Sequence, residues 1–519
     1  LRQVGAVMHS SPLLLTNQGK ISYEVPEDAE DGASPVVSST DREDYVLFGT
    51  TQGVLHVVDA TTGEEKFAFV PNAMVQSQKE AFMNFDTTIG GMDRLYYGVD
   101  GPWTSYTEYV TAADDMLTVG SGLDSQVGKQ LVYGGLRMGG RNYYALDLAD
   151  INNPTLKFTI NPGGECSATN PLGCMGQSWS KPTITYVNWN GTKKLVMLVG
   201  GGYDAEGLPT SISSMPESTA AERAAKQAKI KHYRGYEYDD YEQTNQIGAG
   251  MYMFDALTGQ LLWWTGANAS GTVEGVVSTE VEDMKYSVVS QIRAVDRDSD
   301  GMSDHFYFGD LGGQVWRIDY NNSKGVGDTL RIKTPTKILN LHNGAGSPRF
   351  YEMPAFSTYS LSGTIFAVLS VGSGNRSKPL AGYSTDSTVY DYDGVYNIYD
   401  KDVARNNLFQ LQGAGANQAY TSAALTMKTQ NITLLAENET VPQNATVEQL
   451  VSLSDSTRFS NTTLAAPFDR TQGWYYLFKS NLVQSEKVMS TPIVINNDMF
   501  VTTFDGSRDG LSGDCGAGV

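Results

Sequence analysis

The sequence repeats one short unit, in which a strand, a glycine-rich turn and a second strand ending in aspartate are often followed by Thr-Gly. The two clearest copies end in the stretches 59–63 and 255–259, and weaker copies end at Asp147 and Asp319. Several copies alternate large apolar residues with others at period two, as half-buried strands do. Recurring short strands with few helices between them predict an all-β fold of the β-propeller type, because each unit needs its neighbours to bury its apolar face.

A second pattern places proline directly before an apolar run. Proline lacks the amide donor of a β-ladder, so it fits best at the first residue of a strand. The pattern therefore predicts strand starts at five places: Pro12, Pro35, Pro182, Pro354 and Pro492. Because the first and last copies are alike, we expect an N-terminal strand to complete the last blade and cover its edge.

Together these units predict one domain over residues 1–519, a propeller of about seven blades. Uneven spacing indicates long loop insertions at approximately 72–130, 203–248 and 413–470. The sequence predicts a short helix in the second insertion, with a capping box formed by Thr219 and Glu222 at its start. Long loops on a rigid scaffold often bind partners, although loops without any function are an equal alternative.

The nine residues 296–304 form an acidic loop with the spacing of a cation site. Asp296, Asp298, Asp300 and Asp304 stand at loop positions 1, 3, 5 and 9, with Gly301 at position 6 and the Met302 carbonyl at position 7. This spacing resembles the ligand half of a calcium EF-hand. The alternative is a solvated acidic turn that holds no metal.

The surroundings of the acidic loop depart from an EF-hand. Position 12 is Tyr307, so no bidentate carboxylate is available there. The flanking stretches 291–295 and 305–308 are β-branched or aromatic and predict strands in place of helices. We therefore expect the loop to connect two strands of a hairpin.

Charge and hydropathy exclude several classes of partner. The formal net charge of −21 makes nucleic acid and anionic membrane surfaces unfavourable partners. No apolar run approaches the roughly 20 residues that span a bilayer, so we expect no transmembrane segment. Leu1 in place of Met indicates a processed or excised fragment.

The chain has three cysteines: Cys166, Cys174 and Cys515. The first two enclose a short loop of the kind that exported proteins close with a disulfide, and free thiols are the alternative. No third and fourth ligand for zinc stands near them. Cys515 is then left over, and its partner is expected outside this fragment.

Several stretches of the chain resemble a known family, the C-terminal domain of the PilY/PilC-type proteins of type IV pili. The matching stretches are VGAVMHSSP (4–12), AFVPNA (68–73), VDG (99–101), GGRNYYALD (139–147), WSKP (179–182), GGGY (200–203), FGDLGGQVWR (308–317) and GWYY (473–476), with Cys515. They cover nearly the whole chain apart from the insertions at 203–248 and 413–470. The Asp-Ala-x-Thr-Gly turns also resemble those of quinoprotein propellers.

The family resemblance implies a function that the residues alone do not. It implies a propeller behind a longer N-terminal region, located outside the cell at a pilus tip or at the outer-membrane surface after export through the periplasm. It also implies Ca²⁺ as cofactor, coupling to pilus extension and retraction, and roles in twitching motility and adhesion. The implied partners are pilin and minor pilin subunits and host or abiotic surfaces. The calcium role transfers to the acidic loop, and the adhesive role transfers to no particular residue.

Two enzymatic readings are weaker alternatives. A quinoprotein dehydrogenase shares the blade pattern, but this chain lacks the neighbouring cysteine pair that such enzymes often place beside the cofactor. A hydrolase would need a motif such as His-Glu-x-x-His or Gly-x-Ser-x-Gly, and neither occurs. His305 beside the acidic loop is more simply a strand residue. We therefore expect no catalytic and no organic-cofactor residues.

Overall fold

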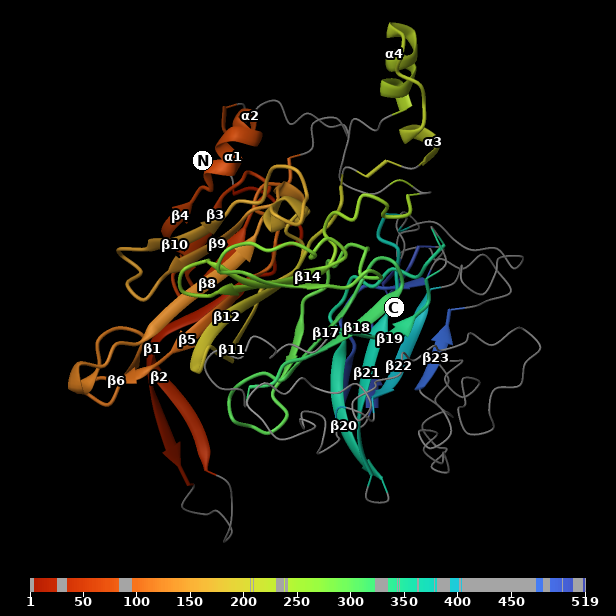
Figure 1. The fold of residues 1–519 in the computed structure, drawn as a ribbon. Helices are drawn as coiled ribbons and strands as arrows, with labels where there is room; N and C mark the ends of the chain where they lie inside the picture. Colours follow the sequence, from red (N-terminus) through yellow and green to blue (C-terminus); the bar gives the residue numbers. More distant parts are fainter. Residues whose placement is uncertain are drawn as a thin grey trace.

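A computed structural model of the chain is built almost entirely from antiparallel sheets that follow one another along the sequence (Figure 1). It describes residues 4–25, 35–83, 96–205, 207–208, 210–229, 238, 241–322, 335–342, 344, 346–361, 364–377, 379, 393–400, 403, 473–478, 486–496, 498–506 and 517–518. Within these ranges, five sheets have four or more strands, and two smaller sheets lie near the C-terminus.

The first three sheets occupy the N-terminal half of the chain. The first sheet has the spatial order β4 (Glu65–Phe69), β3 (Leu55–Asp59), β2 (Val36–Gly49), β1 (Leu13–Glu24), β7 (Leu117–Thr118) and β6 (Val110–Thr111). The second has the order β10 (Thr155–Ile160), β9 (Tyr143–Asp147), β8 (Lys129–Gly135) and β5 (Trp103–Glu108). The third has the order β11 (Thr183–Trp189), β12 (Thr192–Gly200), β13 (Met251–Asp255), β14 (Leu261–Gly266) and β15 (Val277–Glu280).

The remaining sheets continue this order. The fourth contains β16 (Arg293–Val295), β17 (His305–Gly309), β18 (Gln314–Asp319) and β19 (Thr336–Asn340). The fifth contains β20 (Ala355–Leu361), β21 (Thr364–Gly372), β22 (Gly394–Asp400) and β23 (Gly473–Leu477). The small sheets pair β24 (Glu486–Val488) with β27 (Thr503–Asp505) and β28 (Ala517–Gly518), and β25 (Ile493–Ile495) with β26 (Asp498–Phe500).

This succession of largely antiparallel sheets of four to six strands confirms the all-β, propeller-type fold expected from the repeats. The described sheets do not close a ring, so the number of seven blades remains a prediction. The expected position of the N-terminal strand is wrong: β1 pairs with β2 and β7 of the first sheet and not with the last one. A long hairpin register from Leu13↔Leu47 to Glu24↔Val36 stabilises β1 within its own sheet, so it has no need of a distant partner.

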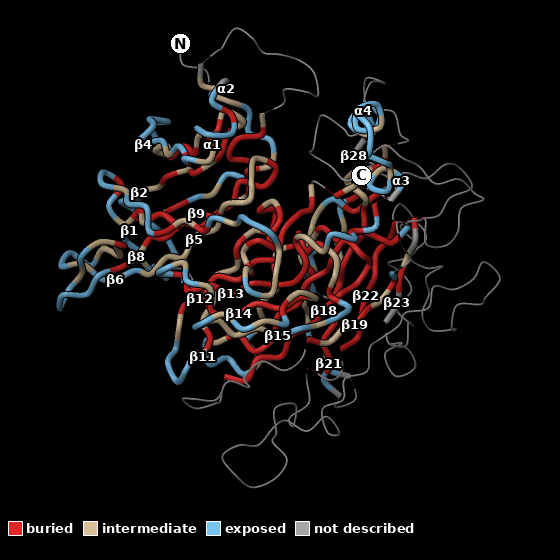
Figure 2. The backbone as a smooth tube through the Cα atoms, turned by 45° about the horizontal axis from the view of Figure 1, so that its top comes forward, coloured by how far each residue is buried: buried red, intermediate tan, exposed pale blue. Residues whose placement is uncertain are grey.

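The hydrophobic core lies between neighbouring sheets, because successive side chains of a strand point to opposite faces. Trp263 and Trp264 of β14 show this directly. Trp264 packs in the cluster between the second and third sheets, and Trp263 packs in the cluster between the third and fourth. Buried backbone accordingly fills the middle of the molecule, and the outer loops are exposed (Figure 2).

Each of the first five sheets has a glycine at the end of its second strand, and we call these the junction glycines. They are Gly49, Gly135, Gly200, Gly309 and Gly372. A Cβ atom at these positions would lie 2.1 to 2.7 Å from the segment that leads into the next sheet, at Val99, Ser178, Val288, Phe350 and Val488 respectively. Real Cβ contacts are essentially never shorter than 3.0 Å, so the close approach of successive sheets requires glycine.

The aspartate turns repeat in detail. In the first sheet, Asp59 Oδ1 accepts hydrogen bonds from the Thr61 and Thr62 amides at 2.9 Å. In the third sheet, Asp255 Oδ1 accepts them from the Leu257 and Thr258 amides at 2.9 and 3.1 Å. Such an Asx turn satisfies backbone donors where the strand ends, which explains why the sequence places aspartate there.

The predicted proline starts are confirmed, because all five prolines directly precede a strand. The strands that follow them are β1, β2, β11, β20 and β25. The proline ring thus occupies the position where no ladder donor is required.

Two helices precede the second sheet and two stand in the second predicted insertion: α1 (Asn72–Ser77), α2 (Lys79–Met83), α3 (Thr210–Ser213) and α4 (Ala220–Lys229). The capping box at α4 is confirmed, since the Thr219 amide donates to Glu222 Oε2 at 2.8 Å and the Glu222 amide donates to Thr219 Oγ1 at 3.1 Å. Helix α4 projects from the body of the molecule (Figure 1). No helix among the described residues is long and apolar enough to cross a bilayer.

The three insertions remain predictions. Within 72–130 the structure places β5, the first strand of the second sheet, together with the short strands β6 and β7 that extend the first sheet. Residues 413–470 lie outside the described residues.

The predicted disulfide is present between Cys166 and Cys174, with an S–S distance of 2.06 Å. It closes the loop between β10 and β11, next to the one-turn helix η4 (Pro171–Cys174). Cys174 is buried and belongs to the cluster between the second and third sheets, so the bond attaches an exposed loop to the core. Cys515 lies outside the described residues.

Substitution of a junction glycine tests the close approach of the sheets. We expect Gly200→Ala to lower the free energy of unfolding by about 1–3 kcal/mol, because its Cβ would lie 2.3 Å from the Val288 carbonyl oxygen. Gly163→Ala is the matched control, since nothing lies within 4 Å of its Cβ position. Urea unfolding followed by tryptophan fluorescence measures both, and equal stabilities would contradict the steric argument.

Asp310, directly after β17, provides a pH test of the core. Burial raises the pKa of Asp310 to about 7, although hydrogen bonds from the Trp316 indole and the Gln314 and Gly312 amides act to lower it. The folded state therefore holds this proton more tightly than the unfolded state, whose carboxyl titrates near 3.8. The stabilisation is complete below that value and is lost as the pH rises through about 7.

In the wild type, the raised pKa of Asp310 should lower the free energy of unfolding by roughly a few kcal/mol as the pH rises from 4 to 7. We expect this decrease to be smaller in Asp310→Asn. The control is Asp59→Asn. The Thr62 amide lowers the pKa of Asp59, so its contribution runs in the opposite direction and is lost as pH falls. Unfolding measured at half-unit pH intervals decides this, and an unchanged slope in Asp310→Asn would refute the assignment.

Candidate metal centre

The acidic loop connects β16 to β17 as the hairpin prediction requires. Val295, the last residue of β16, pairs with His305, the first residue of β17. Tyr307 at position 12 is fully buried in β17 and donates its hydroxyl to Asp400 at 3.4 Å. Both flanking strands are therefore confirmed, and the hairpin holds the two ends of the loop together.

The loop brings three carboxylates together. One ligand oxygen each from Asp296, Asp298 and Asp304 lies within 4.8 Å of the others. Asp300 is not part of this group, and its Oδ1 accepts a hydrogen bond from the Met302 amide at 2.8 Å. Asp300 and the Met302 carbonyl therefore remain predicted ligands, and the geometry of the other three is suited to a cation.

Backbone hydrogen bonds shape the loop around Asp296. Its Oδ1 accepts from the Ser299 amide at 2.7 Å, and its Oδ2 accepts from the Gly301 amide at 2.8 Å. Gly301 has a φ of +80°, a left-handed conformation that glycine adopts without a steric penalty. The sharp turn predicted at position 6 is thus present.

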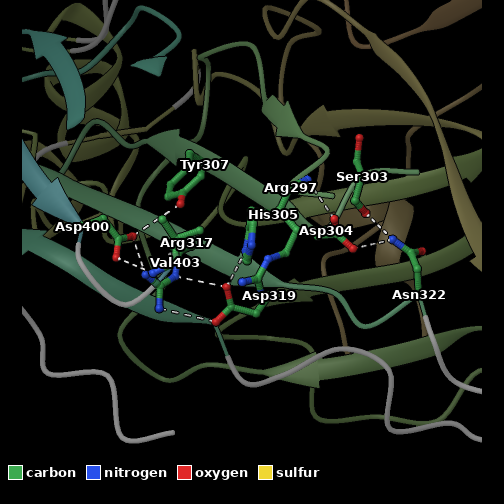
Figure 3. Close-up of polar contacts among 10 residues, drawn as sticks. All are labelled: Arg297, Ser303, Asp304, His305, Tyr307, Arg317, Asp319, Asn322, Asp400 and Val403. Carbon is green, nitrogen blue, oxygen red and sulfur yellow. Dashed lines mark hydrogen bonds and ion pairs between the residues drawn. The ribbon is translucent and has the colours of Figure 1, made fainter. Parts of the chain in front are cut away.

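Asp304 is the buried end of the cluster, with 5% of its surface exposed, whereas Asp296 and Asp298 are exposed. Its Oδ2 accepts from the Arg297 amide at 3.0 Å, and its Oδ1 accepts from the Asn322 side chain at 2.9 Å (Figure 3). Burial raises the pKa of Asp304 despite these hydrogen bonds, and the nearby Asp298 charge acts in the same direction. A cation beside Asp304 would relieve both penalties.

A buried ionic network continues from the loop into the fold (Figure 3). His305 Nδ1 lies 2.8 Å from Asp319 Oδ1, and Arg317 Nε lies 3.1 Å from the same oxygen. Arg317 also pairs with Asp400 at the end of β22. Because Asp400 belongs to the fifth sheet, the network joins the hairpin that holds the loop to the neighbouring sheet.

The donor set of the loop determines which ions it suits. Carboxylate oxygens are hard ligands that favour Ca²⁺ or Mg²⁺ over metals that prefer sulfur or imidazole. Each carboxylate oxygen has two lone pairs, so the hydrogen bonds to Asp296 and Asp304 leave capacity for a metal. The residues present therefore fit a hard divalent cation.

Two side chains that contact the acidic loop could not be predicted from the sequence. Asn322 follows β18 and is 18 positions from Asp304, so no local spacing signals their contact. Lys193 Nζ lies 3.5 Å from the Asp300 carbonyl oxygen, across 107 positions of sequence. Only the packing of the third sheet against the fourth brings Lys193 there.

A buried cluster from the connections of five successive sheets bears on the enzymatic alternatives. Its members are Tyr97, Met138, Trp179, Tyr203, Val289, Leu311 and Tyr351. The Trp179 ring stacks on Tyr203 with centroids 4.4 Å apart, and the Arg137 guanidinium lies 4.0 Å from its centroid. A quinone stacked on Trp179 would have to displace these contacts. His305 is fully buried against Asp319, which agrees with its reading as a strand residue.

The fold and the acidic loop together describe a class, a propeller-type protein with three clustered carboxylates in one hairpin that could hold a cation. No family model matches the sequence. The type IV pilus biogenesis factor PilY1 of Pseudomonas aeruginosa is 25% identical over 322 residues, which is 61% of this chain and 20% of that protein. A PilY1 homologue of Xylella fastidiosa is 21% identical over 528 residues, or 99% of this chain and 28% of that protein.

Among solved structures, the C-terminal domain of Pseudomonas aeruginosa PilY1 has a TM-score of 0.49 at 18% identity and covers 89% of this chain and 76% of that domain. A quinohemoprotein alcohol dehydrogenase from Pseudomonas putida has a TM-score of 0.31 at 13% identity, covering 89% of this chain and 61% of that one. These similarities to PilY1 and its homologue confirm the resemblance that the motifs of the chain indicated. The chain spans only 20% to 28% of the length of these two curated relatives.

Removal of the Arg317 guanidinium tests whether the buried ionic network stabilises the fold. We expect Arg317→Met to lower the unfolding free energy by about 3–5 kcal/mol, because Asp319 and Asp400 lose the guanidinium that compensates their buried charges. Arg42→Gln, which removes an exposed pair with Asp44, is the control and should change stability little. Similar unfolding midpoints in denaturant for the two variants would contradict this role.

Proposed function

We propose that this chain is the calcium-responsive propeller of a type IV pilus biogenesis factor. The clustering of Asp296, Asp298 and Asp304 in one blade hairpin is the observation that carries the calcium part of the proposal. The pilus part is supported by the relatives, which are type IV pilus biogenesis factors. On this proposal the protein acts outside the cell, at the pilus tip or the outer-membrane surface.

The acidic loop would work as an electrostatic switch. Four carboxylates within nine residues repel one another, and the backbone hydrogen bonds of Asp296 and Asp304 hold them together against that repulsion. A bound Ca²⁺ would supply the compensating positive charge. Asp304 and His305 are consecutive, so a loop held in one position would also hold the start of β17 and its buried network.

The calcium-bound loop would then present one surface to pilus partners, and the calcium-free loop another. Such a switch acts only if the partners have different affinities for the two states. We propose pilin and minor pilin subunits as these partners, and pilus extension and retraction as the controlled process. Twitching motility and attachment to host or abiotic surfaces would follow from that control.

We propose that the protein is not an enzyme. The buried aromatic cluster around Trp179 and the burial of His305 support this reading among the described residues. The quinoprotein alternative predicts a quinone absorbance band in the purified protein, and such a band would revive it.

Calcium titration tests the site itself. We expect wild-type protein to bind Ca²⁺ with saturation in isothermal titration calorimetry, and Asp298→Asn to weaken that binding by at least about tenfold, since it removes one ligand charge. Glu274→Gln removes one exposed charge elsewhere and serves as the matched control. If wild type fails to bind at millimolar Ca²⁺, or if both variants bind like wild type, the acidic loop is not the site.

The mechanism is tested separately in cells. Asp304→Ala, introduced into the full-length protein, should abolish the dependence of piliation on calcium as well as calcium binding. If Asp304→Ala abolishes binding and calcium-dependent piliation persists, the loop binds calcium without controlling the pilus.

A further inference from the structure

A cavity of about 200 Å³ opens between the second and third sheets. Its wall from the second sheet contains Tyr106 of β5 and Lys129 of β8. The wall from the third sheet consists of Tyr186, Thr192, Lys193, Lys194, Leu195, Asp255 and Leu257. We call it the lysine pocket.

The lining of the lysine pocket contains more basic than acidic residues, on a protein whose net charge is −21. Three lysines face one aspartate among its lining residues. Lys194 pairs with Asp255 at 2.6 Å, and Lys129 pairs with Glu108. Two of the three lysines are therefore paired with carboxylates, and the charge of Lys193 is the one that can attract an anion to the cavity.

Lys193 differs from the other two lysines. Within the part of the chain that the structure describes, its contacts are the Asp300 carbonyl oxygen at 3.5 Å and the Tyr186 ring, whose centroid lies 5.0 Å from Nζ. Neither contact is an ion pair with a carboxylate. Its ammonium group is therefore the one best able to pair with a ligand.

Two tyrosines complete the polar lining. The Tyr106 and Tyr186 hydroxyls lie 2.6 Å apart, and the Tyr106 hydroxyl lies 3.4 Å from Glu108 Oε2. Burial, and then the contact with Tyr186, raises the pKa of Tyr106 well above its ordinary value, so its hydroxyl remains a donor at neutral pH. The pocket thus combines lysine side chains, tyrosine hydroxyls and aromatic rings, which together suit a sugar or a similar polar ring carrying an anionic group.

We propose that the lysine pocket binds a small oxyanion, a carboxylate or a sulfate ester on a group of about monosaccharide size, and that Lys193 couples this binding to the acidic loop. The size limit follows from the volume, which is below the roughly 300 Å³ of ordinary drug-sized sites. The coupling rests on the proposed calcium function, whereas binding in the pocket does not.

The sign of the coupling follows from geometry. A Cβ placed on Gly301 would lie 2.8 Å from Lys193 Nζ, so this ammonium rests directly on the acidic loop. While the loop is uncompensated, its carboxylates attract Lys193 and compete with a ligand for it. Positive charge gained by the loop weakens that competition and also attracts the anion. The two sites therefore favour each other, and thermodynamic linkage requires the same factor in both directions.

Saturation-transfer NMR titrations of the intact chain with D-glucuronate and with D-glucose 6-sulfate test the pocket, with D-glucose as the uncharged control. The first arm uses protein freed of calcium by chelating resin, at constant ionic strength. We expect saturable binding of at least one anionic sugar and none of glucose. The anionic sugar that binds more tightly identifies the preferred oxyanion as a carboxylate or a sulfate ester.

Lys193→Gln should weaken that binding by at least about tenfold, the loss of one charge-assisted hydrogen bond. Lys157→Gln, which removes a lysine paired with Asp147 outside the pocket, should leave the affinity within about twofold. Circular dichroism and the unfolding midpoint verify that Lys193→Gln remains folded. Equal binding of glucose, absence of binding by both anions, or an unchanged affinity in Lys193→Gln would overturn the pocket.

The second arm repeats the titration in millimolar Ca²⁺. We expect wild type to bind the anion at least about fivefold more tightly, and Asp298→Asn and Lys193→Gln to lose this gain. An unchanged anion affinity in a protein that binds Ca²⁺ would overturn the coupling. If calorimetry shows no Ca²⁺ binding, the proposed function fails, and the calcium-free arm still decides whether the pocket binds oxyanions.

Discussion

Successive sheets approach so closely at the end of each second strand that no side chain fits between them. The Val288 carbonyl oxygen, in the segment that leads to the fourth sheet, lies 2.3 Å from where a Cβ on Gly200 would be, and the Val99 carbonyl oxygen lies 2.1 Å from a Cβ on Gly49. The side chains next to these points interdigitate, and the cores between neighbouring sheets are continuous with them. This contact repeats at the first five sheets, so it limits the separation between each of these sheets and the segment that leads to the next one.

The acidic loop depends on this scaffold because its own residues could not hold their charges together. Repulsion among the carboxylates is offset by the hairpin at Val295 and His305, by the amide donors to Asp296, and by Asn322 on the far side of Asp304. Behind the hairpin, Arg317 joins the fourth sheet to Asp400 in the fifth. A charged loop on a rigid base can respond to a cation without disturbing the core, which agrees with the function that we propose.

The local predictions succeeded where a few neighbouring residues determine the conformation. The Thr219–Glu222 capping box, the turn that follows the strand ending at Asp59 and the disulfide from Cys166 to Cys174 each involve residues close in sequence. The predicted position of the N-terminal strand failed for the opposite reason. A proline before an apolar run shows that a strand begins, and it contains no information about which strand will be its partner.

The amino-acid sequence by itself determined the repeated strand units, the turns that end them and the spacing of Asp296, Asp298 and Asp304, because hydrogen bonding and side-chain alternation act over a few residues. Only the tertiary structure decided that Asn322 supports Asp304, that Arg317 links two sheets, and that Lys193 lies between the acidic loop and the lysine pocket. These contacts join residues from 18 to 107 positions apart, and their distances depend on how whole sheets pack together.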